Sequence, residues 1–164
     1  MRLELAKLED FDKYYELKIE DSNVFWTGWK NKPDYEVLRE FYFDKVVNLK
    51  TIKDRRIYLA YENNIVVGYV YIDYVDENTF ALSPAISTNY QGKGYGKKLI
   101  KLAIQEGLNL GFKNMEAYIR EDNIASQKCF ENNGAIKTNI YNNVYIENKN
   151  EYIKMYKYYY TMGR

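Results

Sequence analysis

The sequence predicts a single α/β domain, and three observations lead to that fold class. Segments with apolar residues at helical spacing are interleaved with segments in which every second residue is apolar, which indicates both helices and strands. Asn63 and Asn64 separate two strand-like runs and tolerate the positive φ of a tight hairpin. A further strand-like run passes through the glycine-rich turn 91–96 into an amphipathic helix. A chain of 164 residues is long enough to bury one core.

The N-terminal half of the chain is predicted to hold a strand, two helices and a hairpin. Residues 3–8 alternate apolar with charged side chains and are predicted to be a strand. Apolar residues recur at helical spacing in residues 9–20 (Phe11, Tyr14, Tyr15, Leu17) and 34–48 (Tyr35, Leu38, Phe41, Tyr42, Val46). Residues 21–33, between these helices, are predicted to be turn-rich, and the hairpin strands are residues 56–61 and 65–74.

The C-terminal half is predicted to add strands and helices on either side of the glycine turn. Pro84 lies in the strand 80–87 and cannot donate a ladder hydrogen bond, so we expect a bulge there. Helix 94–110 turns Leu99, Leu102, Ala103 and Leu108 toward the sheet and ends at Gly111. Residues 114–120 alternate as a strand, and Asn123 caps a helix over residues 123–133 that Gly134 ends. Residues 135–147 and 151–161 are predicted to be the closing strands.

Composition narrows the classes of function. The formal net charge is +1, which gives no long-range basic field, so we expect no nucleic-acid partner. The chain has no histidine and a single cysteine, Cys129, which excludes an internal disulfide, a Cys/His zinc site and a histidine-activated nucleophile; we expect no metal. No long apolar run follows the alternating N-terminus, so we expect a cytoplasmic protein without a membrane partner. The 19 tyrosines are interpreted as strand residues.

The glycine turn has the features of a phosphate-binding loop. Glycine allows positive φ and close approach to a ligand, and a helix that begins there directs unpaired N–H groups at an anion. A P-loop needs four residues between its first glycine and the Gly-Lys pair, whereas only Lys93, Gly94 and Tyr95 separate Gly92 from Gly96. The glycine spacing also fails to match the dinucleotide-binding fingerprint.

The pattern that fits is Gln/Arg-x-x-Gly-x-Gly/Ala, met by Gln91, Gly94 and Gly96. With the strand before it, this turn resembles the acetyl-CoA loop of the GNAT acyltransferase superfamily. Asn123-Ile124-Ala125-Ser126, then Phe130 and Asn133-Gly134-Ala135, resemble the second conserved segment of that superfamily and have family-like spacing to the turn. The resemblance runs from about residue 57 to residue 145. The competing interpretation is an ordinary glycine-rich turn before a helix.

The resemblance implies a mixed, mostly antiparallel twisted sheet of six or seven strands flanked by about four helices, with acetyl-CoA between two parallel strands. The groups implied in binding the CoA pyrophosphate are the backbone N–H groups of the turn, namely those of Gln91, Gly92, Lys93, Gly94, Tyr95, Gly96 and Lys97. Ile86 and Ser87 would offer backbone hydrogen bonds to pantetheine, and Asn123 and Ser126 would contact CoA from the next helix. Lys97 and Lys98 could approach the CoA phosphates. The competing roles are core packing for Ile86, helix capping for Asn123, an exposed hydroxyl for Ser126 and solvated charges for the lysines.

The implied reaction is N-acetylation by direct transfer. A neutral amine attacks the thioester carbonyl, a strand N–H stabilises the oxyanion, and no covalent enzyme intermediate forms. Many members protonate the leaving sulfur with a tyrosine seven positions after the asparagine, but this chain has Phe130 there, so the catalytic residues are unknown. A thiol with a pKa of about 8.5 is already a fair leaving group, and water or Tyr90, Tyr118 or Tyr145 could replace the missing acid.

The sequence assigns neither the general base nor the acceptor site. Glu20, Asp21, Asp73, Asp76 and Glu77 lie near predicted element ends, and each is either a base or a solvated charge. Trp26 and Trp29, in the cluster 25–29, would form an aromatic wall for the acceptor or else pack in the core. The sequence predicts a buried, inert thiol for Cys129.

These residues predict an acetyl-CoA-dependent N-acetyltransferase that acts as a monomer or homodimer. The acceptor is an amine of a small molecule, an amino acid, an aminoglycoside or a protein N-terminus, and the sequence does not select among them. One alternative, motivated by Phe130, is a CoA-binding regulatory or interaction module with weak or no turnover. A second alternative is a carrier-protein or peptide-binding domain that uses the exposed aromatic cluster and has no affinity for CoA.

Overall fold

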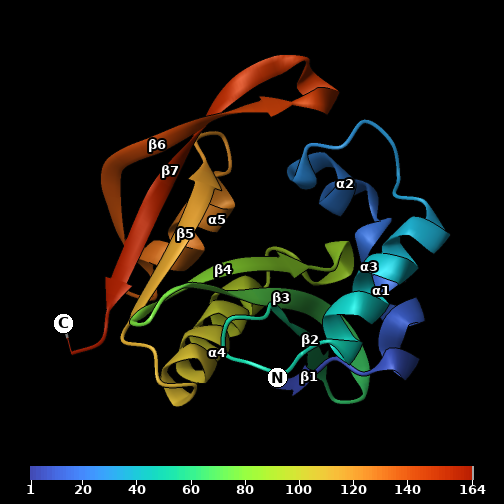
Figure 1. Cartoon of the computed structure of the whole chain (residues 1–164). Coiled ribbons are helices and arrows are strands. Elements are labelled where there is room, and N and C mark those ends of the chain that lie inside the picture. Colours follow the sequence, from blue (N-terminus) through green and yellow to red (C-terminus); the bar gives the residue numbers. More distant parts are fainter. Residues whose placement is uncertain (164) are drawn as a thin grey trace.

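A computed structural model describes residues 1–163 of the chain. These residues form a seven-stranded sheet with the strand order β1-β2-β3-β4-β5-β7-β6 (Figure 1). Neighbouring strands are antiparallel except β4 and β5, which are parallel. The strands are β1 Arg2–Leu5, β2 Arg56–Glu62, β3 Ile65–Asp76, β4 Thr79–Ile86, β5 Asn114–Arg120, β6 Ile136–Ile146 and β7 Glu151–Thr161.

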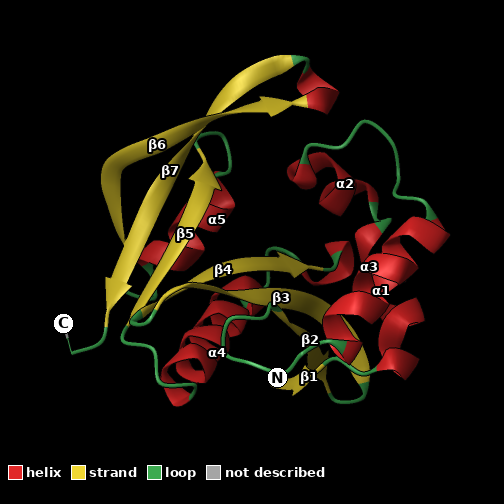
Figure 2. Cartoon of the chain, viewed as in Figure 1, coloured by secondary structure: helices red, strands yellow, loops and turns green. Residues whose placement is uncertain are grey.

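Helices cover both faces of the sheet (Figure 2). They are α1 Phe11–Lys18, α2 Asp21–Thr27, α3 Tyr35–Val47, α4 Tyr95–Asn109 and α5 Ile124–Glu131, with short 3₁₀ turns η1 Leu8–Asp10, η2 Thr88–Tyr90 and η3 Glu147–Lys149. α4 and α5 share a buried core with one face, whereas α1 and α3 share a second core with the other. The mixed, mostly antiparallel architecture confirms the predicted fold class. No helix in the described part of the chain has both the length and the apolar character needed to span a membrane.

The described residues form one α-helix more than the four expected. The additional helix is α2, which lies where the sequence predicts only turns. Residues 21–27 are helical because tertiary contacts hold a segment with weak helical periodicity. The amide of the buried Asn23 donates to the carbonyl of Leu17 at the end of α1, with an N–O distance of 2.7 Å. Gly28 then ends the helix at φ 90°, a left-handed conformation that glycine adopts without steric cost. The prediction for residues 21–33 is therefore wrong in its first half.

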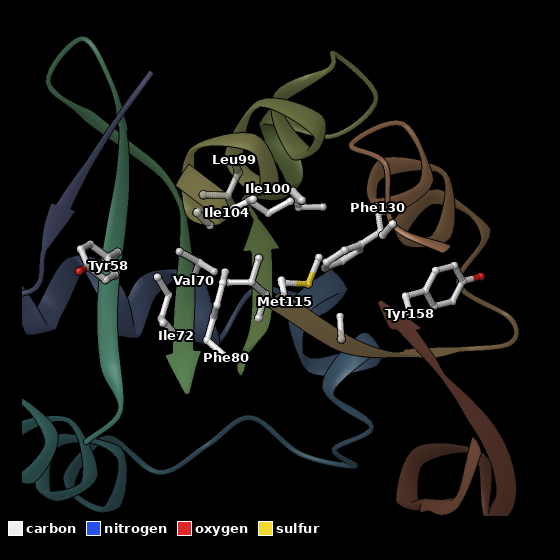
Figure 3. Packing of buried hydrophobic residues seen from close by; sticks show 14 of the residues in the cluster. Tyr58, Val70, Ile72, Phe80, Leu99, Ile100, Ile104, Met115, Phe130 and Tyr158 are labelled. Atoms are coloured by element: carbon white, nitrogen blue, oxygen red, sulfur yellow. The ribbon is translucent and has the colours of Figure 1, made fainter. Parts of the chain in front are cut away.

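Alternation along the central strands builds the two cores. In β2, Tyr58 and Ala60 face the α4 side, while Ile57 and Leu59 face α1 and α3. Figure 3 shows the first core, in which Leu99, Ile100 and Ile104 of α4 pack over Val70, Phe80 and Met115 of the sheet. Burying a large apolar side chain contributes about 1.5–3 kcal/mol. These cores fix the positions of the strands that border the cleft described below.

The two parallel strands pair for a short distance and then separate. β4 pairs with β5 only from Thr79 to Ala81, opposite residues 114–116, and beyond this point β5 turns away from β4 (Figure 1). The predicted bulge at Pro84 is absent, because its register with β3 is unbroken and Pro84 lies opposite Val70. The N–H of Ser87 donates to Val67 of β3 at 2.8 Å, so by alternation the even-numbered residues of β4 direct their backbone groups away from β3. The missing N–H of Pro84 therefore faces the gap and breaks no ladder.

Candidate active site

A cleft of about 590 Å³ occupies the gap between β4 and β5 and passes from one face of the sheet to the other. On the side of α4 and α5 it is lined by residues of the glycine turn and of α5, namely Gln91, Gly92, Gly94, Gly96, Asn123, Ala125, Ser126, Cys129 and Phe130. Its middle is bordered by β4 and β5, including Leu82, Pro84, Ile86, Ala117, Tyr118 and Ile119. On the opposite side it is lined by Lys18, Asn23, Trp26, Thr27, Arg55, Tyr69, Tyr71, Arg120 and Met155. The cleft therefore offers two chemically different ends.

The glycine turn presents a cradle of backbone donors at the first end. Gly92 and Gly94 adopt φ of 72° and 83°, and a Cβ on either would meet no atom within 4 Å. The first helical bond of α4 joins the N–H of Lys98 to the carbonyl of Gly94 at 3.3 Å. The N–H groups of residues 95–97 therefore have no acceptor within the helix. Free N–H groups and the positive end of the helix dipole make this turn suitable for an anion.

Gln91 connects the turn to the rest of the cleft. Its side-chain amide donates to the carbonyl of Ile86 at 3.1 Å and to the hydroxyl of Ser22 at 3.0 Å. One side chain thus ties the turn to the end of β4 and to α2. The carbonyl of Ile86 is used by this contact, whereas its N–H faces the gap because Ile86 is an even-numbered residue of β4. Ile86 therefore keeps a backbone donor for a ligand.

Ser87 contributes less to the cleft than expected, and three residues of the turn present only their backbones to it. Ser87 does not line the cleft: its N–H donates to Val67, and its buried hydroxyl donates to Glu20 at 2.7 Å. The side chains of Lys93, Tyr95 and Lys97 also lie outside the cleft lining. The ammonium of Lys93 donates to the carbonyl of Asn89 at 2.9 Å. Only the backbones of these three residues belong to the anion cradle.

Asn123 caps α5 and also faces the cleft. Its Oδ1 accepts a hydrogen bond from the N–H of Ser126 at 3.1 Å, which confirms the capping role. Because Oδ1 is used in this way, Nδ2 points away from the helix end, and among the described residues it donates no hydrogen bond. Asn123 therefore combines a structural acceptor with a donor available to a ligand. Ser126 lines the same wall and is half-buried.

Phe130 lines the cleft but is 1% exposed, because its ring packs in the core beneath α4 (Figure 3). It supplies no proton. Of the three tyrosines considered as substitutes, Tyr118 lines the cleft, whereas Tyr90 packs against Tyr95 and Tyr145 donates to the side chain of Asn150. The neighbouring Cys129, predicted to be buried, is only half-buried and lines the cleft; its partial burial raises the pKa of the thiol and favours the protonated form.

No carboxylate lines the cleft among the described residues. Glu20 accepts from Thr88 N–H at 2.7 Å and is held beside η2, and Asp73 pairs with Arg55. Asp21 is exposed, with Lys32 3.7 Å away. Asp76 accepts from the N–H of Asn78 in a turn, and Glu77 is exposed in the same turn. These five side chains are therefore structural or solvated groups. Within the described residues, no three His, Cys, Asp or Glu side chains are grouped to hold a metal.

The second end of the cleft is aromatic and cationic. Trp26 lines this end, and its ring stacks under the guanidinium of Arg120 at 5.0 Å. Trp29 does not line the cleft but lies behind it, 4.7 Å from the ammonium of Lys18. Both tryptophans are half-buried. Burial lowers the pKa of Lys18 to about 8, and the positive charge of Arg55 acts in the same direction.

Sequence analysis did not identify Lys18, Arg55 or Arg120 as site residues. A signal for Lys18 exists, because it lies four positions after Tyr14 and therefore on the buried side of the first helix. Arg120 follows the alternation of β5 on the side opposite Ile119, so it had to face the other surface of the sheet. For Arg55, which precedes β2, the sequence carries no such signal.

An open, mixed sheet with a separated parallel pair and a glycine turn at its mouth defines an acyltransferase-like fold. The model of the acetyltransferase (GNAT) family matches residues 10–135. The chain belongs to this family, which places it among the acyltransferases.

Two curated relatives agree with this assignment. The uncharacterized N-acetyltransferase YfmK of Bacillus subtilis is 29% identical over 79 residues, a match that covers 48% of this chain and 53% of that relative. The chain thus spans only about half the length of that relative. The ribosomal protein bS18-alanine N-acetyltransferase of Haemophilus influenzae is 26% identical over 136 residues, covering 83% of this chain and 82% of the relative.

Solved structures share the fold at lower identity. Spermidine N-acetyltransferase from Vibrio cholerae, in complex with CoA and spermine, superimposes with a TM-score of 0.83 at 14% identity, covering 98% of this chain and 94% of the other. An aminoglycoside acetyltransferase in complex with coenzyme A gives a TM-score of 0.78 at 18% identity, with the same coverage of 98% and 94%. At these identities the likeness concerns the fold.

Proposed function

We propose that the protein transfers an acetyl group from acetyl-CoA to a primary amine, with both substrates bound in the cleft between β4 and β5. The observation that carries the proposal is the continuous cleft, which joins the anion cradle of the glycine turn to an aromatic, cationic pocket across the sheet. One substrate can therefore enter from each face and the two can meet between the strands.

The residues at the glycine-turn end of the cleft fit CoA. The open space above Gly92 and Gly94 and the free N–H groups of residues 95–97 suit a pyrophosphate. The N–H of Ile86 and the side-chain amide of Asn123 are available as donors to the pantetheine amides. Lys97 and Lys98 are exposed on the first turn of α4, where their charges favour phosphate. Acetyl-CoA supplies the acetyl group as a thioester, which needs no covalent help from the protein.

The middle of the cleft would promote transfer by positioning. Leu82 and Ile86 are the β4 residues beyond Ala81 whose N–H groups face the gap, since Pro84 has none. Either donor could polarise the thioester carbonyl, and one such donor is typically worth about 10²–10³ in kcat. No carboxylate lines the cleft in the described part of the chain, so we assign proton removal from the amine to water. Because Phe130 cannot protonate the leaving sulfur, CoA would leave as a thiolate or take its proton from Tyr118 or water.

Calorimetric titration with acetyl-CoA and with CoA tests the cofactor half of the proposal. Gly94→Trp should abolish binding, because a large side chain would fill the anion cradle. Gly111→Trp is the matched control: Gly111 lies at the other end of α4, also has positive φ (101°), and a Cβ there would also meet no atom within 4 Å, but it does not line the cleft. Equal binding by wild type and both variants, or no binding by wild type, would refute the site.

Free-thiol release in the presence of amines tests the transfer half. An enzyme should release thiol from acetyl-CoA in proportion to acceptor, and Gly94→Trp should not. The alternative function, a CoA-binding regulatory module, is motivated by Phe130. It predicts CoA binding that Gly94→Trp abolishes, with no thiol release above the buffer rate for any amine.

A further inference from the structure

Lys18 is a buried cation at the acceptor end of the cleft. It is the last residue of α1, is 5% exposed, and lines the cleft directly. Its ammonium donates to the hydroxyl of Tyr69 at 3.1 Å and lies within 6.0 Å of the rings of Tyr14, Trp29 and Tyr71. Aromatic faces attract a cation but do not neutralise its charge.

The other two cations of this pocket have counter-ions. Arg55 makes a two-point ion pair with Asp73, with N–O distances of 2.6 and 2.8 Å. Arg120 makes a similar pair with Asp122 at 3.0 and 2.9 Å. Lys18 makes no ion pair with any described residue. It is therefore the cation of the pocket whose charge remains unbalanced.

An unbalanced buried charge is costly, and folding alone gives no reason to keep it. A buried ammonium without a carboxylate destabilises the folded protein even after the surroundings relax. Methionine or leucine at this position would fill the same aromatic cage at lower cost. Its remaining ammonium N–H groups find no acceptor among the described residues. These groups lie beside open cleft volume, where an anionic atom of a ligand would satisfy them.

We propose that the acceptor is an amine that also carries an anionic group, a carboxylate or a phosphate, and that this group pairs with the ammonium of Lys18. This inference rests on the proposed acetyl transfer. The pocket has one unbalanced positive charge, that of Lys18, and no Asp or Glu among its described lining residues, so it is unsuited to a polycationic acceptor such as a polyamine. An amino acid or an aminoalkyl phosphate matches both ends of the site, with the amine toward the β4–β5 gap and the anion toward α1.

The experiment compares acceptors that differ only in charge, at saturating acetyl-CoA. The panel of acceptors with an anionic group is the protein amino acids, glycine included, together with β-alanine, 4-aminobutyrate, 5-aminovalerate and 2-aminoethyl phosphate. The neutral partners are the corresponding primary amides and ethanolamine, and putrescine and spermidine are the cationic members. We expect kcat/KM for the best anionic acceptor to exceed that of its neutral partner by at least tenfold. The preferred partner pair distinguishes a carboxylate from a phosphate.

Lys18→Met links that preference to the ammonium. Methionine has a similar length and no charge, so the charge preference should fall to near one, chiefly through a higher KM for the anionic acceptor. Lys101→Met, at an exposed site on α4 away from the cleft, should retain the full preference. Acetyl-CoA affinity should be the same in all three proteins, which separates loss of acceptor binding from damage to the cofactor site.

Each outcome decides the question. Failure to bind acetyl-CoA would overturn the proposed transfer and this inference together. Binding of acetyl-CoA with equal or better transfer to neutral and cationic amines would overturn the inference alone, as would a preference that Lys18→Met leaves intact. If no panel member accepts acetyl, calorimetry of the panel with the CoA complex gives the answer: anionic members must bind wild type at least tenfold more tightly than Lys18→Met, and equal or undetectable binding refutes the proposal.

Discussion

The carboxylate of Glu20 accepts a hydrogen bond from the backbone N–H of Thr88 at 2.7 Å. It also accepts from the hydroxyls of Ser87 at 2.7 Å and Thr88 at 3.0 Å. Glu20 precedes α2, and Thr88 begins the η2 turn that leads into the glycine turn. One side chain thus holds the connection between β4 and the anion cradle against the α1–α2 junction. Glu20, a candidate base from sequence, has a positioning role.

Glu20→Ala should destabilise the protein and weaken acetyl-CoA binding. Hydrogen bonds to a charged group contribute about 1.5–3 kcal/mol each, and partial exposure of this cluster places the total loss at about 2 kcal/mol. Urea unfolding measures the stability, and calorimetry measures the affinity for acetyl-CoA. We expect the affinity to fall about tenfold, which corresponds to about 1.4 kcal/mol of binding free energy. Glu16→Ala, at an exposed site on α1, is the control. Equal effects of the two variants would contradict the positioning role.

Gly107→Ala should destabilise α4 although alanine is the better helix former. A Cβ at residue 107 would lie 2.2 Å from Cζ of the fully buried Phe80, so the ring must move. Overpacking of this kind costs about 1–3 kcal/mol, which outweighs a gain in helix propensity of about 1 kcal/mol. Thermal unfolding should show a lower Tm for the variant.

In a Phe80→Leu background, the stability change caused by Gly107→Ala should reverse its sign. With the ring removed, Gly107→Ala should be neutral or stabilising, by up to about 1 kcal/mol. A double-mutant cycle of urea unfolding measures the coupling between residues 80 and 107. Additive effects of the two substitutions would show that the predicted clash is not the cause.

Lys18→Met should be more stable than wild type at neutral pH. The folded protein lowers the pKa of Lys18 from 10.5 to about 8, so between these values the unfolded chain binds more protons than the folded one. The unfolding free energy of wild type therefore increases as pH rises through this range. At pH 7 the buried charge of Lys18 lowers that free energy by about 3 kcal/mol, reduced by the cation–π contribution.

The advantage of Lys18→Met should shrink steadily from pH 8 to pH 10. Tyr14, Tyr69, Tyr71 and Arg55 surround the side chain of Lys18. These neighbours are the same in the variant, so the difference in urea unfolding free energy between wild type and Lys18→Met isolates the titration of the lysine. A pH-independent difference would show that Lys18 keeps an ordinary pKa in the folded protein.

Asp122→Asn should cost about 3 kcal/mol, the lower end of the range for breaking a buried ion pair, because Asp122 is 30% exposed while Arg120 is 3% exposed. Hydrogen bonding from Arg120, supported by Lys149, lowers the pKa of Asp122 from 3.8 to about 2. The contribution of its charge to the unfolding free energy is thus fully present above pH 3.8 and is lost as pH falls through about 2.

Urea unfolding between pH 2 and pH 6 measures this loss. The difference in unfolding free energy between wild type and Asp122→Asn should be constant from pH 4.5 to pH 6 and should decrease toward pH 2. Asp21→Asn removes the partner of an exposed pair with Lys32 and should change stability by less than about 1 kcal/mol. A comparable loss in both variants would argue against the buried pair.

The parts of the fold that depend on local chemistry were predicted well. The glycine turn was identified because positive φ at Gly92 and Gly94 is a property of the residues themselves. The seven strands were found because each alternates or forms an apolar run. α2 was missed because its helix depends on a contact between Asn23 and Leu17, which no local pattern reveals.

The aromatic, cationic end of the cleft was predicted less completely because it is built from distant segments. Trp26 was a candidate for an aromatic wall, but its neighbour Arg120 is 94 positions further along the chain. Lys18 was missed because a lysine at a helix end is normally read as a solvated charge. Its spacing from Tyr14 places it on the buried side of the helix, but packing against Tyr69 of β3 and Trp29 is what encloses its ammonium.

The separation of β4 from β5 has a consequence for self-association. Beyond Ala81, β4 leaves a row of backbone groups without a strand partner, and such a row is where a strand of another molecule can add. Pro84 removes the donor between Leu82 and Ile86, so an incoming strand would lose the central one of the three N–H donors that the row would otherwise offer. The proline that sequence analysis linked to a bulge thus allows the sheet to stay open for ligands without inviting aggregation.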